Sequence, residues 1–200
     1  LGDVYVNEAF SASHRSHASI TGIPKYLPSY IGFQFEQELK YLSEFKNKFK
    51  RPLLFMIGGA KFKTKLPLIK KYMKISDNVF VGGALAHDFF VAKDYEIGKS
   101  LMDKKYFHLN IILNNKKLHL PVDVVTLKNK IKNSDSVNAS ETIVDAGPQT
   151  IKNVQKLIQN SNTIIWNGPF GYYEKGYRKS TEIILKTLAK SNKKVLIGGG

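Results

Sequence analysis

Short apolar runs that end in glycine recur along the chain, and stretches with helical periodicity separate them. This alternation is typical of a parallel β-sheet whose strands are joined by crossover helices. In such a sheet ligands bind beyond the carboxyl ends of the strands, where glycines let a ligand approach the backbone and leave helix N-termini accessible to phosphate. A tight turn explains any single glycine pair, but the repetition favours a nucleotide site. The expected strands are 53–57, 78–81, 122–127, 143–145, 163–166 and 195–197.

Apolar residues three and four positions apart predict amphipathic helices between several of these strands. The clearest stripe comprises Phe35, Leu39, Leu42, Phe45 and Phe49. Prolines and glycine precede this helix, and a domain boundary fits there. The predicted helices span 34–49, 64–73, 149–159 and 178–191; we also expect the first half of 97–118 to be helical and 128–140 to be a loop.

The charge balance raises the question of a nucleic-acid partner, because 31 Lys and Arg residues against 16 Asp and Glu residues give a net charge of +15. Arg15, Arg51 and Arg178 are the arginines, so nearly all of this charge is lysine, which lacks the planar fork that reads phosphate and guanine. No segment matches a helix-turn-helix, a zinc finger or an aromatic RNA-binding motif. A lysine-rich surface over an ordinary enzyme is the preferred interpretation, and a basic nucleic-acid-binding protein is the alternative.

Other classes are excluded by what the sequence lacks. No run approaches 18 uninterrupted apolar residues, which argues against a membrane span. The absence of cysteine excludes disulfides, thiolate metal sites and a cysteine nucleophile. We therefore expect a cytoplasmic protein without a membrane partner.

The segment 58–65, with the sequence GGAKFKTK, is the richest candidate site. A buried strand leads into a glycine turn, after which Lys61 and Lys65 lie one helical turn apart on one face. Two ammonium groups beside a helix N-terminus make a polyanion site, because the helix dipole and the free amides add to the cations. A solvated lysine face is the alternative, and the glycines favour the anion site.

A second motif runs from Trp166 to Glu174 and supplies a strand end, a constrained turn and a carboxylate that can accept hydrogen bonds from sugar hydroxyls. Together with residues 14–17, 58–65, 122–123 and 145–148, its order and spacing resemble the phosphoglycerate kinase family. The resemblance covers nearly the whole chain. It implies an α/β fold: a doubly wound, Rossmann-like parallel sheet between helix layers, with a remnant of a second α/β domain.

The resemblance also implies a domain organisation and an activity. Residues 1–33 would end an N-terminal domain that binds 3-phosphoglycerate, 34–50 would be an interdomain helix, and 51–200 would form most of a nucleotide-binding domain. The family transfers a phosphoryl group reversibly between 1,3-bisphosphoglycerate and ADP in glycolysis, giving 3-phosphoglycerate and ATP, with Mg²⁺. We expect a monomeric, hinge-bending kinase, of which these 200 residues would be an inactive fragment. A nucleotide-binding module without turnover is the other alternative.

Residue by residue, the resemblance implies that Arg15 holds the phosphate end of phosphoglycerate, that Lys61 faces the transferred phosphoryl group and that Lys65 binds nucleotide phosphates. Glu174 would accept the ribose hydroxyls. The Mg²⁺-binding aspartate would lie beyond Gly200, so we expect no metal ligand within the chain. The nucleotide site would comprise Gly58, Gly59, Lys65, Gly82, Gly83, Gly147, Asn167, Pro169, Tyr172, Glu174, Gly198, Gly199 and Gly200.

The chain also departs from the family pattern. Ser11, Ala84 and Ser180 stand where glycines are common, Thr64 replaces an aspartate, and Glu8 replaces another. None of these changes removes a charged group that would touch substrate. Ser11 and Ala84 could narrow the approach to the backbone.

Overall fold

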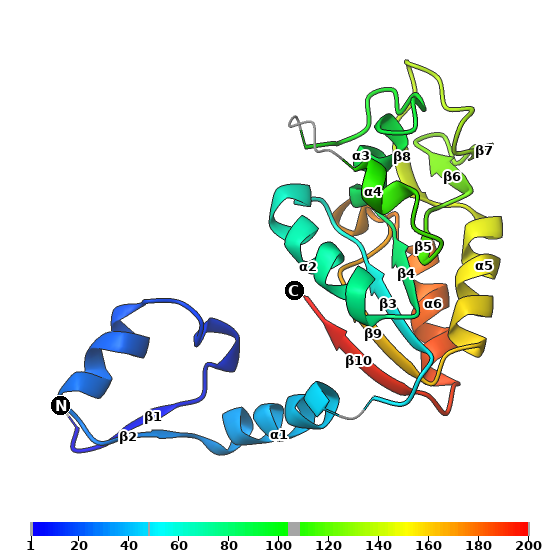
Figure 1. The fold of residues 1–200 in the computed structure, drawn as a ribbon. Helices are drawn as coiled ribbons and strands as arrows, with labels where there is room; N and C mark the ends of the chain where they lie inside the picture. Colours follow the sequence, from blue (N-terminus) through cyan, green and yellow to red (C-terminus); the bar gives the residue numbers. More distant parts are fainter. Residues whose placement is uncertain (1, 48, 104–108, 200) are drawn as a thin grey trace. The chain divides into compact units, whose positions relative to one another are not determined.

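The computed structural model describes residues 2–47, 49–103 and 109–199. The chain divides into two compact units, Leu1–Phe49 and Lys50–Gly200. The boundary lies at the end of the predicted interdomain helix, which belongs to the first unit. Figure 1 shows the helices and strands of each unit.

The first unit is held together by one parallel strand pair and one helix cap. The carboxylate of Glu8 accepts the backbone N–H of Phe35 at 2.9 Å, which satisfies an otherwise free donor in the first turn of the helix. Phe35 is the one buried hydrophobic side chain within residues 2–47, and its ring meets Phe10 edge-on at 5.2 Å. The elements are β1 (Tyr5–Asn7), η1 (Phe10–Ala12), η2 (Ala18–Gly22), η3 (Ile23–Lys25), β2 (Ser29–Ile31, paired with β1) and α1 (Phe33–Asn47).

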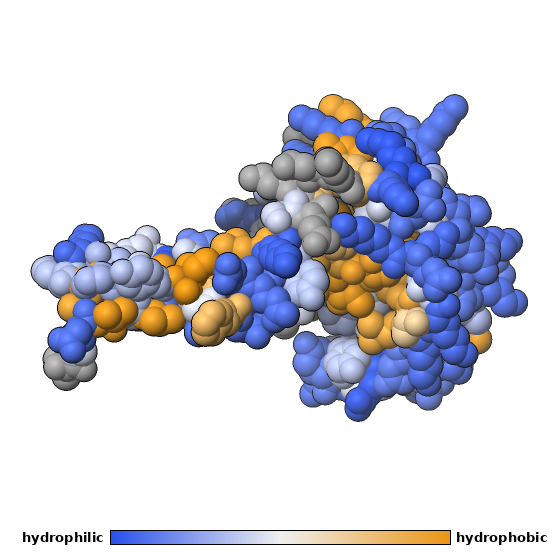
Figure 2. All heavy atoms as spheres, turned by 90° about the horizontal axis from the view of Figure 1, so that it is seen from below, coloured by the Kyte–Doolittle hydropathy of each residue, from blue (hydrophilic) through white to orange (hydrophobic). Residues whose placement is uncertain are grey.

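Apolar side chains also lie on the surface of the first unit. Figure 2 shows hydrophobic residues gathered there, and Phe33 is 90% exposed while Val4 and Val6 are each 54% exposed. The unit therefore buries little apolar surface within itself.

The main sheet of the second unit has five parallel strands in the order β10-β9-β3-β4-β5. From β3 the chain adds β4 and β5 on one side of the sheet and later β9 and β10 on the other side. This is the doubly wound order, in which the order of strand addition reverses between β3 and β9. The predicted fold class is confirmed, and each of the four predicted strands in this sheet is found within one residue of its expected bounds. The strands are β3 (Leu53–Ile57), β4 (Asn78–Val81), β5 (Leu118–His119), β9 (Thr163–Asn167) and β10 (Lys194–Gly198).

Helices cover both faces of this sheet because alternate strand residues point to opposite sides. Leu54 and Met56 of β3 join a core with α5 and α6, whereas Phe55 stacks on Tyr72 of α2 with ring centroids 3.8 Å apart. The sequence predicted α2, α5 and α6 but not the short α3. The helices are α2 (Phe62–Ile75), α3 (Leu85–Val91), α4 (Asn110–Leu113), α5 (Pro148–Gln159), η4 (Tyr173–Lys175) and α6 (Lys179–Ala189).

Two predicted strands, 122–127 and 143–145, do not belong to the main sheet. They form a separate antiparallel sheet in the order β7-β6-β8, in which β6 is Asp123–Thr126, β7 is Ile131–Asn133 and β8 is Ile143–Ala146. The prediction of a loop over 128–140 was also wrong, since β7 lies within it. An apolar run identifies a strand but does not specify which strand pairs with it. Asn129, with φ of 55°, makes the turn between β6 and β7.

The predicted helix in the first half of 97–118 was wrong for the residues that the structure describes there. Gly98 has φ of 58° and pairs with Thr142, and Lys99 donates its backbone N–H to Glu141 at 2.7 Å. These bonds hold the segment against the small sheet. Residues 104–108 lie outside the described ranges, and the helix found further on is α4.

Two buried carboxylates attach the small sheet to the helices of the main sheet. Asp123 of β6 accepts the backbone N–H of Gln149 at 2.9 Å and of Thr150 at 2.7 Å, in the first turn of α5. Asp145 of β8 accepts the backbone N–H of Ser180 in the first turn of α6 at 3.1 Å. Each carboxylate satisfies donors that the helix itself leaves free and meets the positive end of the helix dipole. Within the described ranges, no helix combines the length and apolar character needed to cross a membrane.

Substituting Gly147 tests the cap on α5. A methyl group at this position would overlap the Asp123 carboxylate, so Gly147→Ala has to displace the cap. We expect the free energy of unfolding, measured by urea denaturation, to fall by about 1–3 kcal/mol. Gly198→Ala is the control, because its nearest neighbour would be 3.8 Å away. Equal stability of the two variants would contradict the cap.

Candidate functional site

A cavity of about 770 Å³ opens at the carboxyl ends of β3, β4 and β9. It lies where the strand order reverses, so that α2 leaves β3 toward one face of the sheet and α6 follows β9 on the other. The crevice between such diverging connections is where ligands bind in open α/β sheets. The small sheet closes the far side of the cavity through β6 and β8.

Backbone atoms form the floor of the cavity. The N–H of Gly58 donates to Asn167 at 2.8 Å, and the N–H of Gly59 donates to Pro169 at 2.9 Å, so the turns after β3 and β9 lie directly on each other. A methyl group at Gly58 would overlap the Pro169 carbonyl. Gly83 has φ of 61°, and a Cβ there would lie 2.9 Å from the amide nitrogen of Gly59. Side chains at these positions would force the turns apart.

Lys65 and Lys61 bring positive charge to this floor. Lys65 lies in the first turns of α2, and its Nζ donates to the carbonyl of Gly58 at 2.7 Å. The side chain is half-buried, and this burial lowers the pKa of the amine below its usual 10.5. Lys61 precedes α2, is exposed and lines the same cavity. The structure thus brings the two lysines singled out in the sequence to one wall.

The opposite end of the cavity is apolar. Ala86 and Phe90 of α3, Leu101, Val124 of β6 and Ile143 of β8 line it. Four of these side chains are buried, and Leu101 is exposed. A flat aromatic ring system suits such a surface better than an anion does.

His87 of α3 lies at this apolar end and is 4% exposed. Its Nδ1 is 2.6 Å from the carbonyl oxygen of Leu101, which can only accept, so Nδ1 carries the proton. Burial lowers the pKa of His87 to about 4, and the hydrogen bond to Leu101 opposes this only in part. The imidazole is therefore neutral at physiological pH.

The third wall is the segment that follows β9. Pro169, Phe170, Gly171, Tyr172 and Glu174 contribute to it. The indole Nε1 of Trp166 donates to Gly168 at 2.8 Å and so fixes the start of the segment. Glu174 and the half-exposed Tyr172 stand at the rim, where their polar atoms can reach a ligand.

The predicted site residues differ in where the structure places them. Those that line the cavity are Gly59, Lys61, Lys65, Gly83, Pro169, Tyr172, Glu174 and Gly199. Gly58, Gly82, Asn167 and Gly198 lie in or beside the strand ends without lining it, and Gly147 instead precedes α5 against Asp123. Gly200 lies outside the described residues, and Arg15 is exposed in the first unit.

Sequence reasoning missed His87, Lys99 and Leu101, and it used Asp145 only as part of the motif 145–148 without assigning it to the site; all four line the cavity. A histidine and an aspartate in adjacent positions of an apolar stretch, His87-Asp88, were the available signal for α3. Lys99 and Leu101 gave no such signal, because only tertiary contacts bring their segment to the cavity.

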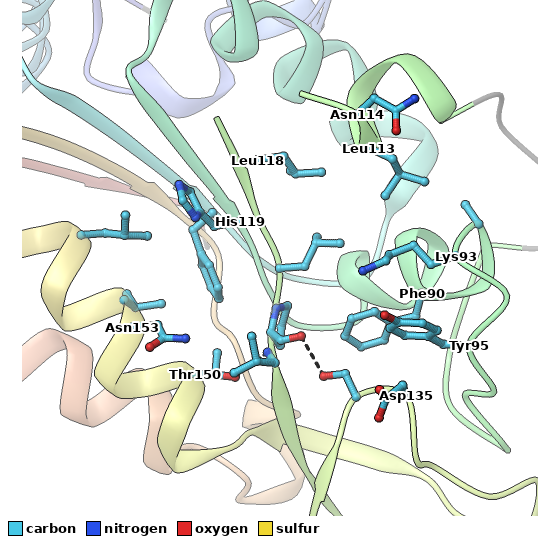
Figure 3. A pocket seen from close by; sticks show the side chains of 18 of the residues that line it. Phe90, Lys93, Tyr95, Leu113, Asn114, Leu118, His119, Asp135, Thr150 and Asn153 are labelled. Atoms are coloured by element: carbon cyan, nitrogen blue, oxygen red, sulfur yellow. Dashed lines mark hydrogen bonds between the residues drawn. The ribbon is translucent and has the colours of Figure 1, made fainter. Parts of the chain in front are cut away.

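A second cavity, of about 990 Å³, lies between β5, α5 and the residues after α3 (Figure 3). Its buried hydroxyl groups are engaged within the protein: Thr150 donates to Asp123 at 2.7 Å and Ser134 to the Pro121 carbonyl at 2.7 Å. The Nε2 atom of His119 is 2.8 Å from Asn78, and Lys93 lies 4.7 Å above the ring of Tyr95. The smaller cavity at the strand reversal is therefore the better candidate site.

The family model described as "Phosphoglycerate kinase" matches residues 1–200. The chain belongs to the phosphoglycerate kinase family. A curated phosphoglycerate kinase of Borrelia garinii is 37% identical over 213 residues, covering all of this chain and 54% of that protein. One from Wigglesworthia glossinidia brevipalpis is 38% identical over 210 residues, covering all of this chain and 53% of that protein.

Solved structures of the family agree. The phosphoglycerate kinase of Coxiella burnetii matches with a TM-score of 0.84 at 33% identity, over 100% of this chain and 55% of its own. That of Pyrococcus horikoshii matches with a TM-score of 0.83 at 26% identity, over 99% of this chain and 54% of its own. The chain spans about half the length of the relatives it matches.

A resident metal does not fit the residues that the structure describes. Among them, no three His, Asp or Glu side chains gather as a metal site. Asp145 and Glu174 are the acidic residues of the cavity wall, and Asp145 already accepts hydrogen bonds from Ala146 and Ser180.

The titration of His87 tests the apolar end. We expect its imidazole resonances, followed by NMR, to titrate near pH 4. Because the folded pKa is depressed, the stability that His87 contributes is present above pH 6.5 and is lost as the pH falls toward 4. Burial raises the pKa of the neighbouring Asp88 to about 7, so its contribution is lost as the pH rises from 3.8 toward 7. The contributions of His87 and Asp88 to stability change in opposite directions with pH. The His87 resonance, and not the free energy of unfolding, is therefore the decisive readout. Titration of His87 near pH 6.5 would contradict a buried, neutral ring.

Proposed function

We propose that this chain binds ADP and ATP in the cavity at the strand reversal. The observation that carries the proposal is that one cavity has Lys61 and Lys65 at one end and an apolar surface, with the exposed Lys99 beside it, at the other. A nucleotide has the same polarity, with an anionic phosphate chain at one end and an aromatic base at the other.

In this proposal each part of the nucleotide meets residues that suit its chemistry. The base lies at the apolar end, between Val124, Ile143 and Leu101. The ribose hydroxyls meet Glu174 at the rim. The phosphates lie over the glycine floor, where Lys65 and the N-terminus of α2 face them.

We propose further that the protein containing this chain is a phosphoglycerate kinase. A terminal oxygen of ADP attacks the phosphorus of the acyl phosphate, the bond from phosphorus to the carboxyl oxygen breaks, and ATP and 3-phosphoglycerate result. Such a reaction needs cations around a charge-rich transition state and little covalent work by the protein. In this proposal Lys61, which is exposed at the cavity wall, stabilises the transferred group, and Arg15 of the first unit binds the phosphate of phosphoglycerate.

The family supports the remaining parts of the proposal. Mg²⁺ enters with the nucleotide phosphates, and the protein acts as a cytoplasmic monomer without a nucleic-acid or membrane partner. The chain alone binds nucleotide without turnover.

Calorimetric titration with Mg-ADP at physiological salt tests the nucleotide site. Lys65→Ala should weaken binding by about 10- to 100-fold, because a charge-assisted hydrogen bond to a phosphate contributes about 1.5–3 kcal/mol. Lys70→Ala is the matched control, since Lys70 lies on the same helix, is exposed and does not line the cavity. Its affinity should equal that of the unmodified chain.

Two results would contradict the proposal. One is an unmodified, folded chain that does not bind Mg-ADP. The other is equal affinity of the Lys65→Ala and unmodified chains. Salt-sensitive binding of a random-sequence DNA duplex in place of ADP would favour the nucleic-acid alternative.

A further inference from the structure

We propose that Asp145 is a positioning residue for the nucleotide, because its buried carboxylate fixes the segment 170–174 that forms one wall of the cavity. This inference rests on the proposed function. Asp145 itself would make no bond to the ligand.

The carboxylate oxygens of Asp145 are engaged by donors within the protein. Its Oδ1 accepts the backbone N–H of Ala146 at 2.8 Å and the hydroxyl of Ser180. Its Oδ2 accepts the backbone N–H of Ser180 at 3.1 Å. Asp145 is 6% exposed and Ser180 is fully buried. The carboxylate therefore joins the end of β8 to the start of α6.

Residues of the wall segment 170–174 pack and hydrogen-bond next to this carboxylate. Gly171 lies so close that a Cβ there would be 2.6 Å from Oδ1 of Asp145. The next residue, Tyr172, donates its N–H to Val144 at 2.8 Å. On the other side, Phe170 donates its N–H to the hydroxyl of Thr181, beside Ser180, at 3.0 Å. Displacing the carboxylate would thus move Gly171, Tyr172 and the Glu174 that follows.

Burial makes this arrangement sensitive to substitution. Desolvation raises the pKa of Asp145, while the hydrogen bonds from Ser180 and Ala146 act in the opposite direction. A buried carboxylate that loses its hydrogen-bond donors cannot replace them with water, so even a small displacement of Asp145 is costly. An amide in its place would turn N–H groups toward the N–H and O–H donors of Ser180 and Ala146.

Asp123 supplies an internal control with nearly the same chemistry. It is also 6% exposed, and it caps α5 through Gln149 and through the N–H and hydroxyl of Thr150. Asp123 does not line the nucleotide cavity, whereas Asp145 does. Substitution of either residue by asparagine should lower stability, but only one should change ligand binding.

The experiment compares Asp145→Asn with Asp123→Asn in the 200-residue chain. Urea unfolding monitored by Trp166, the single tryptophan, should show comparable losses of stability. Calorimetry should show Mg-ADP affinity reduced at least tenfold by Asp145→Asn and changed less than twofold by Asp123→Asn. Adenosine affinity, measured by NMR titration, should fall by the same factor in Asp145→Asn, because the wall segment holds Glu174, which binds the ribose and not the phosphates.

Ser180→Ala removes one donor to Asp145 and leaves the carboxylate in place, so it serves if Asp145→Asn does not fold. We expect a three- to tenfold loss of Mg-ADP affinity. The inference is overturned if Asp145→Asn and Asp123→Asn weaken binding equally, if folded Asp145→Asn binds like the unmodified chain, or if Ser180→Ala does so. Failure of the unmodified chain to bind Mg-ADP would instead overturn the proposed function.

Discussion

The site depends on the reversal of strand order between β3 and β9. The turns after these two strands must pass each other at the same edge of the sheet, and they do so with Gly58 against the Pro169 carbonyl, which also accepts the N–H of Gly59. Only glycine allows this approach. The same constraint leaves backbone without side chains on the cavity floor and directs the N-terminus of α2 and Lys65 toward it, so the lysine end of the cavity follows from the topology.

The small antiparallel sheet completes the cavity, and the caps on α5 and α6 hold it in place. These helices pack on the main sheet through Val154, Ile158, Ile184 and Leu188. Asp123 and Asp145 therefore connect the small sheet to helices that belong to the main core. Val124 and Ile143, which line the apolar end of the cavity, belong to this small sheet.

The sequence predicted those features that local pattern determines. Buried parallel strands are continuous apolar runs, so β3, β4, β9 and β10 were found almost to the residue, as were α2, α5 and α6. The pairing of β6 and β8 in a second sheet was not predictable, because an apolar run does not specify its neighbour. Nor was the path of residues 97–103, which Gly98 and the bond from Lys99 to Glu141 determine.

The same distinction applies to the site. Lys61, Lys65 and the glycines lie in one continuous motif, and the resemblance added Pro169, Tyr172 and Glu174. His87 and Leu101 reach the cavity only through tertiary packing, and no spacing in the sequence marks them, whereas Asp145 lies in a recognised motif that gave it no role at the cavity. Gly147 shows the converse, since its motif suggested a ligand while its neighbour is the Asp123 carboxylate.

The central claim is that the base of a nucleotide lies at the apolar end of the cavity and its phosphates at the lysine end. Methyl-labelled protein with bound Mg-ADP tests this most directly through nuclear Overhauser effects. The account predicts effects from the adenine H2 and H8 protons to the methyl groups of Leu101, Val124 and Ile143. Effects to Leu113 and Leu118, which line the larger cavity, would contradict it.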